Sequence, residues 1–157
     1  LADKGTVSID AQGYLREVVG EEVRPVEWKD MSRVLRATGI LKLNESEMQT
    51  VVGSNDPYEV GKKLAACGVD EVVMTLGSYG SVIYAGDKAY DIPAYKPKKL
   101  VDATGCGDTF STGYLWCRAQ GMGIEEAGKF AAAMCSLKLQ HSGPFDGTIA
   151  DIEQLIG

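Results

Sequence analysis

The stretch from Val101 to Phe110, VDATGCGDTF, constrains the fold of this chain more than any other. Two glycines flank a small residue, and an acid follows them directly: Gly105, Cys106, Gly107 and Asp108. An apolar run begins at Thr109, so the glycines are predicted to form a turn that leads into a helix. The first N–H groups of a helix lack partners within it, and the helix dipole adds partial positive charge there. The pattern therefore predicts an anion-binding turn suited to phosphate.

Asp108 permits two interpretations. An acid beside a phosphate is electrostatically unfavourable, unless its carboxylate accepts the proton of a hydroxyl that attacks the phosphate. Asp108 would then be a general base. The alternative is structural, in which the acid caps the helix and the glycines only form the turn. The spacing alone leaves both interpretations open.

Residues 102–108, DATGCGD, resemble the signature Asp-x-Thr-Gly-(small)-Gly-Asp of the ribokinase-like (PfkB-type) carbohydrate kinases. The stretch is neither a Walker A loop, which needs a Lys after its last Gly, nor a G-x-G-x-x-G dinucleotide motif. The resemblance implies that Asp108 is the catalytic base. It implies that an anion hole for the transferred phosphate is formed by Gly105, Cys106 and Gly107. It also implies that residues before the base help to hold a cation, with Asp102 and Thr104 as candidates.

A second motif follows the apolar stretch 40–43, which is predicted to be a strand. Asn44 is a good helix N-cap and Glu47 lies three residues later, so a capping box is one interpretation. The resemblance implies another, because the family has an Asn-x-x-Glu motif here whose Glu acts on Mg²⁺ and phosphate, largely through water. Mg²⁺ prefers one or two carboxylates together with waters and phosphate oxygens, so a single Glu is chemically sufficient.

A third motif, TLGSYG at residues 75–80, ends the Val-rich stretch 71–76, which is predicted to be a central parallel strand. Its glycines suit a plain hairpin turn. The family has a Thr-x-Gly-x-x-Gly stretch here that contacts the nucleotide, and Thr75, Gly77 and Gly80 match it. In the family, the region after the last long helix flanks the adenine and the cation. His141 and Gly143 are therefore further candidates, although His141 also suits an ordinary helix C-terminus.

Composition narrows the class of protein. The chain has 157 residues with 45% hydrophobic and 24% charged residues, values typical of a globular domain. Its net charge of −6 argues against nucleic-acid or membrane binding, and no apolar run reaches the length of a membrane span. The four cysteines are scattered and there is one His, which disfavours a zinc site or a disulfide scaffold. We therefore expect a cytoplasmic protein.

Predicted strands and helices alternate, which predicts a three-layer α/β/α fold with a Rossmann-like, mostly parallel sheet. Helices are expected over 28–37, 56–67, 109–120, 124–139 and 151–156, and further strands over 5–10, 81–84 and 90–92. A turn at 10–13 and a polar connection closed by Arg24-Pro25 are expected between the first strand and the first helix. Each motif follows a predicted strand, and ligands of such sheets bind beyond the strands' carboxyl ends. We therefore expect the motifs to converge on one crevice.

We expect residues 1–157 to form a single α/β domain, corresponding to the nucleotide-binding carboxyl-terminal half of the family fold. Neither the family's lid nor most of its acceptor-binding half is recognisable, and the abrupt start suggests a fragment. The resemblance implies an ATP- and Mg²⁺-dependent phosphotransferase that moves the γ-phosphate to a hydroxyl of a sugar or nucleoside. A monovalent cation such as K⁺ is a further candidate cofactor. The alternatives are a non-catalytic or truncated nucleotide-binding fragment that needs a partner chain, and a homodimer formed through an exposed sheet edge.

Overall fold

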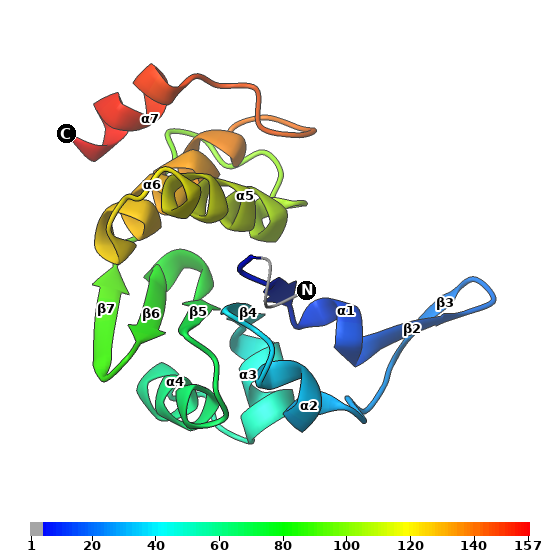
Figure 1. Ribbon diagram of the computed structural model, residues 1–157. Coiled ribbons are helices and arrows are strands. Elements are labelled where there is room, and N and C mark those ends of the chain that lie inside the picture. The colour runs from blue at the N-terminus through cyan, green and yellow to red at the C-terminus, as the bar shows by residue number, and fades with distance from the viewer. Residues whose placement is uncertain (1–4) are drawn as a thin grey trace. The chain divides into compact units, whose positions relative to one another are not determined.

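Figure 1 shows the computed structural model of the chain, in which residues 5–157 are described. These residues form two compact units. Unit 1 comprises the chain up to Thr75 together with Val82–Ala89, and unit 2 comprises Leu76–Ser81 together with Tyr90–Gly157. In the described part of the chain, no helix combines the length and the apolar character that crossing a membrane requires.

Five strands form one sheet in the order β1-β4-β5-β6-β7. They are β1 (Ser8–Asp10), β4 (Ile40–Asn44), β5 (Glu71–Thr75), β6 (Ser81–Ala85) and β7 (Lys88–Ile92). Strand β4 pairs in parallel with β1 on one side and with β5 on the other. The chain is therefore an α/β protein with a mostly parallel central sheet, as the sequence predicts.

The central strands β4 and β5 carry much of the core of unit 1. Both are mostly buried on both faces, as expected for parallel strands that are covered on each side. Their most buried side chains are Leu41, Leu43, Val72, Val73 and Met74. The register places Asp10 beside Lys42 and Asn44 beside Thr75, so polar residues gather at the carboxyl ends of three strands.

Two helices of unit 1 begin where the sequence predicts them, α3 (Glu45–Val52) and α4 (Pro57–Ala66). The start of α4 follows from local chemistry. The Asp56 carboxylate accepts a hydrogen bond from the N–H of Tyr58 at 2.9 Å. Pro57 occupies the first helical position, where its missing N–H costs nothing.

The helix predicted over residues 28–37 is shorter in the structure, where α2 covers Met31–Leu35. Trp28 lies before it, and its ring stacks on Tyr14 of the one-turn helix α1 (Gln12–Leu15), with centroids 4.5 Å apart. An aromatic contact therefore explains the apolar residue that the sequence analysis assigned to a longer helix. The turn predicted at the end of β1 is present, because the Asp10 carboxylate accepts the N–H of Gln12 at 3.1 Å.

The polar connection predicted before Arg24-Pro25 is wrong, because this segment forms a β-hairpin. Strands β2 (Arg16–Val19) and β3 (Glu22–Pro25) pair antiparallel, with Val18 opposite Val23. These two side chains are 73% and 62% exposed, so the hairpin buries little apolar surface within unit 1. In Figure 1 it extends away from the rest of that unit. The sequence does indicate this hairpin, through valines on either side of a short turn that contains a glycine. The charged residues around the valines obscured that pattern.

Helices make up most of unit 2: α5 (Cys106–Ala119), α6 (Ile124–Lys138) and α7 (Ile149–Ile156). Helices α5 and α6 lie side by side, and α7 packs against α6 (Figure 1). A Cβ atom added at Gly113 would lie 3.2 Å from the Cα of Ala131, so the two backbones approach closely. The small-residue run 131–133 is buried, and the small side chain of Ala131 permits this close approach.

Candidate active site

The signature turn begins α5 three residues earlier than the sequence predicts. Gly105 is the N-cap, with φ of 76° and ψ of 7°, in the left-handed region that favours glycine. A Cβ at this position would meet open space, so the requirement for glycine is conformational and not steric. Cys106 and Gly107 thereby join the first turn of the helix.

The start of α5 presents unpartnered amide groups. The N–H of Cys106 donates to the carbonyl of Ala103 at 3.2 Å, and the N–H of Thr109 donates to that of Gly105 at 2.9 Å. Among residues 5–157, no acceptor is found for the N–H groups of Gly107 and Asp108. Gly105 has no side chain that could cap them. Free donors at a helix N-terminus are what an anion site requires, and the predicted binding of phosphate here remains a prediction.

The side chain of Asp108 differs from the other acids at the same helical position. In α3 and α7, the third residue is Glu47 or Asp151, and its carboxylate accepts the N–H of the N-cap residue. Asp108 occupies this position in α5, but its exposed carboxylate makes no hydrogen bond or ion pair within the described residues. The structure therefore gives Asp108 no capping role, and its carboxylate is available to a ligand.

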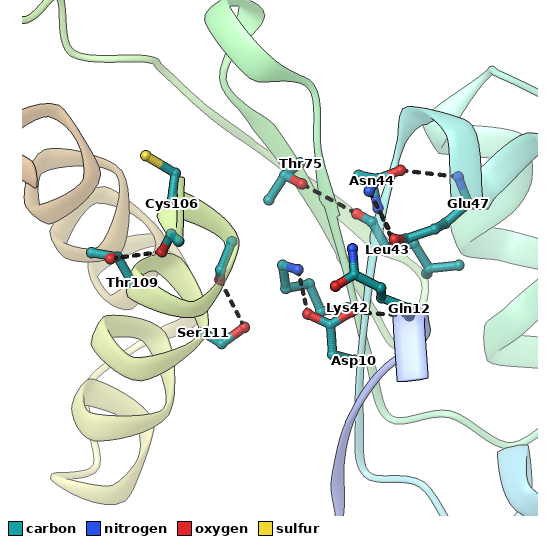
Figure 2. Close-up of polar contacts among 12 residues, drawn as sticks. Asp10, Gln12, Lys42, Leu43, Asn44, Glu47, Thr75, Cys106, Thr109 and Ser111 are labelled. Atoms are coloured by element: carbon teal, nitrogen blue, oxygen red, sulfur yellow. Dashed lines mark hydrogen bonds and ion pairs between the residues drawn. The ribbon is translucent and has the colours of Figure 1, made fainter. Parts of the chain in front are cut away.

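Side-chain hydroxyls support the first turns of α5 from within the helix. Thr109 Oγ1 donates to the carbonyl of Gly105 at 2.9 Å, and Ser111 Oγ donates to that of Gly107 at 3.1 Å. Figure 2 shows both contacts beside Cys106. These bonds occupy carbonyl groups only, so the donors of the turn stay unoccupied.

Helix α6 anchors the segment that precedes the turn. The carbonyl of Leu139, directly after α6, accepts the N–H groups of Val101 and Asp102 at 2.8 and 3.3 Å. Lys138 Nζ donates to the carbonyl of Asp102 at 2.9 Å. The Asp102 carboxylate accepts the N–H of Thr104 at 2.9 Å, and this bond lowers the pKa of Asp102, with the nearby Lys138 charge adding to the effect. Sequence reasoning missed Lys138, because its partner lies 36 residues away.

The thiol of Cys106 is not activated as a nucleophile. Partial burial raises the pKa of its thiol, although the nearby Lys138 charge opposes this shift. The thiol is therefore protonated at neutral pH. Its carbonyl accepts a hydrogen bond from Cys135 Sγ at 3.3 Å, which ties the start of α5 to α6.

Asn44 and Glu47 form the capping box that was one interpretation of their spacing (Figure 2). Asn44 Oδ1 accepts the N–H of Glu47 at 3.0 Å, and Glu47 Oε2 accepts the N–H of Asn44 at 2.9 Å. Glu47 Oε1 accepts a third bond, from Asn44 Nδ2 at 2.8 Å, and the residue is 4% exposed. Each carboxylate oxygen keeps a further lone pair, so the predicted contact with Mg²⁺ through water is chemically compatible with the capping box.

An ion pair that the sequence analysis missed lies on the same strand as Asn44. Lys42 Nζ contacts Asp10 Oδ2 at 2.5 Å, and the Lys42 side chain is almost fully buried. Figure 2 shows the pair, which joins the last residue of β1 to the middle residue of β4. The two residues are 32 positions apart, and only the parallel pairing of the strands brings them together.

The third motif spans both units. Thr75 ends β5 in unit 1, and its hydroxyl lies 3.4 Å from the carbonyl of Leu43 (Figure 2). Gly77 and Gly80 lie in unit 2, on a short 3₁₀ helix, η2 (Gly77–Tyr79), and directly after it. A Cβ at Gly80 would lie 2.2 Å from the carbonyl oxygen of Ile92, so close backbone approach requires this glycine. This requirement is structural, and the predicted nucleotide contact remains a prediction.

The two candidates after α6 are exposed. The N–H of His141 donates to the carbonyl of Lys138 at 3.1 Å, as in an ordinary helix end. Gly143 follows with φ of 89°. Among the residues that the structure describes, no group of three or more His, Cys, Asp or Glu side chains could hold a metal ion. The predicted convergence of all motifs on one crevice remains a prediction, because the candidates belong to two separately described units.

Comparison with known proteins defines the class of protein. Residues 18–150 match the model of the pfkB family of carbohydrate kinases, so the chain belongs to this family. A nucleoside kinase of Methanocaldococcus jannaschii is 30% identical over 124 residues, which cover 79% of this chain and 40% of the relative. A ribokinase of Arabidopsis thaliana is 33% identical over 118 residues, which cover 71% of this chain and 31% of the relative.

Solved structures show the same fold. A pyrophosphate-dependent kinase of the ribokinase family, complexed with a pyrophosphate analog and myo-inositol, matches with a TM-score of 0.82 and 30% identity. The match covers 95% of this chain and 53% of that one. The Arabidopsis thaliana ribokinase complexed with ribose and ATP matches with a TM-score of 0.77 and 28% identity, over 96% of this chain and 47% of that one. The chain thus spans about half the length of these structures, and less than half that of the two curated relatives.

Proposed function

We propose that this chain carries the phosphoryl-transfer part of a pfkB-family kinase, which moves a phosphate to a hydroxyl of a sugar, nucleoside or related polyol. One observation carries the proposal: two unpartnered N–H groups at the start of α5 lie beside an acid that makes no hydrogen bond or ion pair among the described residues. An anion site supplemented by a free carboxylate suits a reaction in which a hydroxyl attacks a phosphate.

In the proposed mechanism, Asp108 accepts the proton of the acceptor hydroxyl while its oxygen attacks the terminal phosphorus of the donor. The N–H groups of Gly107 and Asp108 donate to the oxygens of the transferred phosphate, on which negative charge accumulates. Mg²⁺, when bound through water near Glu47, would neutralise charge on the donor phosphates. Phosphoryl transfer depends mainly on such positioning and electrostatic stabilisation.

ATP is the proposed donor, and pyrophosphate is the specific alternative. Both appear among the similar structures, since one is a pyrophosphate-dependent kinase and another contains ATP and ribose. The predicted contacts of Thr75, Gly77 and Gly80 with a nucleotide favour ATP. Inorganic pyrophosphate would require only the anion site and the magnesium network. Measuring transfer from each donor in parallel would decide between them.

The second candidate function is a nucleotide-binding piece that needs a partner chain or a further segment. The observation that favours it is coverage, because the chain corresponds to about half of the two solved structures described above. Strand β1 is an edge of the sheet among the described residues, and the missing part or a second copy would pair along it. We also propose a cytoplasmic location, since the described residues contain no disulfide.

Turnover of an Asp108→Asn variant tests the role of the base. The measurement uses the protein with its complementary half, a panel of sugars, nucleosides and inositols, and ATP or pyrophosphate as donor. We expect turnover to fall by about 10²–10⁴-fold, the usual contribution of a positioned base. Turnover within about threefold of the parent would rule out Asp108 as the base.

A further inference from the structure

Lys138 is a buried cation that the proposed mechanism does not use. It is the last residue of α6, and its side chain is 1% exposed. Its Nζ lies 2.9 Å from the carbonyl oxygen of Asp102 and 3.6 Å from the Oδ2 of the same residue. Burial of an ammonium group is unfavourable unless oxygen atoms compensate it, so these contacts determine where the charge sits.

The contacts of Lys138 lie on the segment that positions the anion-binding turn. Val101 and Asp102 donate their N–H groups to Leu139, and Thr104 donates its N–H to the Asp102 carboxylate. The next residue is Gly105, the N-cap of α5. The end of α6 therefore holds the entry to the turn through one carbonyl group and one ammonium group. The helix dipole also favours a positive charge at this end of α6.

A carbonyl oxygen and a carboxylate oxygen on one residue are ligands that a small cation would take. The resemblance implied a monovalent cation at Asp102 and Thr104. The residues present do not fit such an ion, because the Lys138 ammonium already lies against both oxygens of Asp102 that would face it. The remaining oxygen, Asp102 Oδ1, accepts the N–H of Thr104.

We propose that the Lys138 ammonium is a built-in monovalent cation, which holds the entry to the anion-binding turn in place without K⁺. The proposal rests on the proposed phosphate-binding role of that turn for its functional meaning, but not for its geometry. Lys138 is a positioning residue here, since it acts through Asp102. Loss of a simple structural contact would not be repaired by ions, whereas loss of a built-in cation would be.

The test compares three proteins in four salts. The variants are Lys138→Met, which removes the charge and keeps most of the stem, and Lys129→Met as a matched control. Lys129 lies on the same helix, but it is partly exposed and paired with Glu125. Each protein is placed in KCl, NaCl, NH₄Cl or tetramethylammonium chloride at equal ionic strength. Hydrogen exchange is measured at the amides of Val101, Asp102 and Thr104, which needs no donor or acceptor substrate.

We expect exchange in the parent and in Lys129→Met to be the same in all four salts. In Lys138→Met, exchange at these amides should rise by about tenfold or more in tetramethylammonium, since a charge-assisted hydrogen bond is lost. K⁺ or NH₄⁺, which are small enough to enter the vacated position, should reverse most of that rise.

Three results would overturn the proposal. Parent exchange that responds to K⁺ would show a separate ion site. Unchanged exchange in Lys138→Met would show that the ammonium does not hold the segment. An equal rise of exchange in all four salts would show that Lys138 makes only a structural contact, which no ion replaces. If Lys138→Met does not fold, the parent alone still tests the proposal, because exchange that depends on K⁺ in the parent would overturn it. Titration of the parent with Mg²⁺ and ATP in the same salts tests the proposed function separately, because absent binding with salt-independent exchange would contradict only that function.

Discussion

Truncation of Glu47 separates the structural role of the capping box from the proposed magnesium role. Glu47→Ala removes two hydrogen bonds to Asn44, at 2.9 and 2.8 Å, and leaves both donors of Asn44 without their acceptor. Because the residue is 4% exposed, water replaces these bonds poorly. Loss of one hydrogen bond to a charged group costs about 1.5–3 kcal/mol of stability, and local rearrangement of the helix end offsets part of this cost. We expect the free energy of unfolding to fall by about 2–4 kcal/mol.

Urea unfolding followed by circular dichroism at pH 7 measures this loss. The matched control is Asp151→Ala, which removes the same kind of bond from the capping box of α7 at an exposed position. It should lower stability less than Glu47→Ala does, because water reaches the freed donors. Equal losses, or a loss below about 0.5 kcal/mol for Glu47→Ala, would contradict the reasoning that burial makes this box strong.

Three further predictions follow from the described residues. Gly105→Ala should lower the free energy of unfolding by about 1–2 kcal/mol through its left-handed backbone alone, whereas Gly80→Ala should cost clearly more, as urea unfolding would show. The lowered pKa of Asp102 stabilises the fold above its unfolded pKa, near 3.8, and this stability is lost as pH falls through the lower folded pKa. The gap in thermal midpoint between parent and Asp102→Asn should therefore shrink on acidification, and a constant gap would contradict it. Burial raises the pKa of Cys117 to about 11, so iodoacetamide at pH 7.5 should modify exposed Cys67 well before Cys117, as peptide mass spectrometry would reveal.

The sequence predicts much of the fold because strong local signals mark its elements. The Val-rich sequence of β5 predicts a buried parallel strand, and Asp56-Pro57 predicts the start of α4. Asn44 and Glu47 reveal a helix start by spacing alone. In each case the residues that determine the helix or strand are neighbours in the chain. The local sequence pattern therefore contains the interactions that form the element.

The sequence hides features whose partners are distant. Lys42 and Lys138 are ordinary charges in the sequence, and only strand pairing or helix packing brings each to its carboxylate. The hairpin β2–β3 was missed for a different reason, because its three valines lie exposed among charged residues and give no alternation of buried positions. The sequence also does not show that the Asp108 carboxylate is available. Asp108 lies three residues after the N-cap Gly105, as Glu47 lies three residues after Asn44 in a complete capping box.

The most direct test of the central claim is calorimetric titration with Mg²⁺ and ATP. The proteins are the parent, Asp108→Asn, and a double variant with Gly105 and Gly107 both changed to Val. We expect the Asp108→Asn protein to bind ATP within about threefold of the parent, because the base acts on the acceptor and not on the donor. The double variant should lose binding, because bulky residues distort the turn that holds the phosphate. Undiminished binding by a folded double variant would contradict the claim that the turn at the start of α5 is the phosphate site.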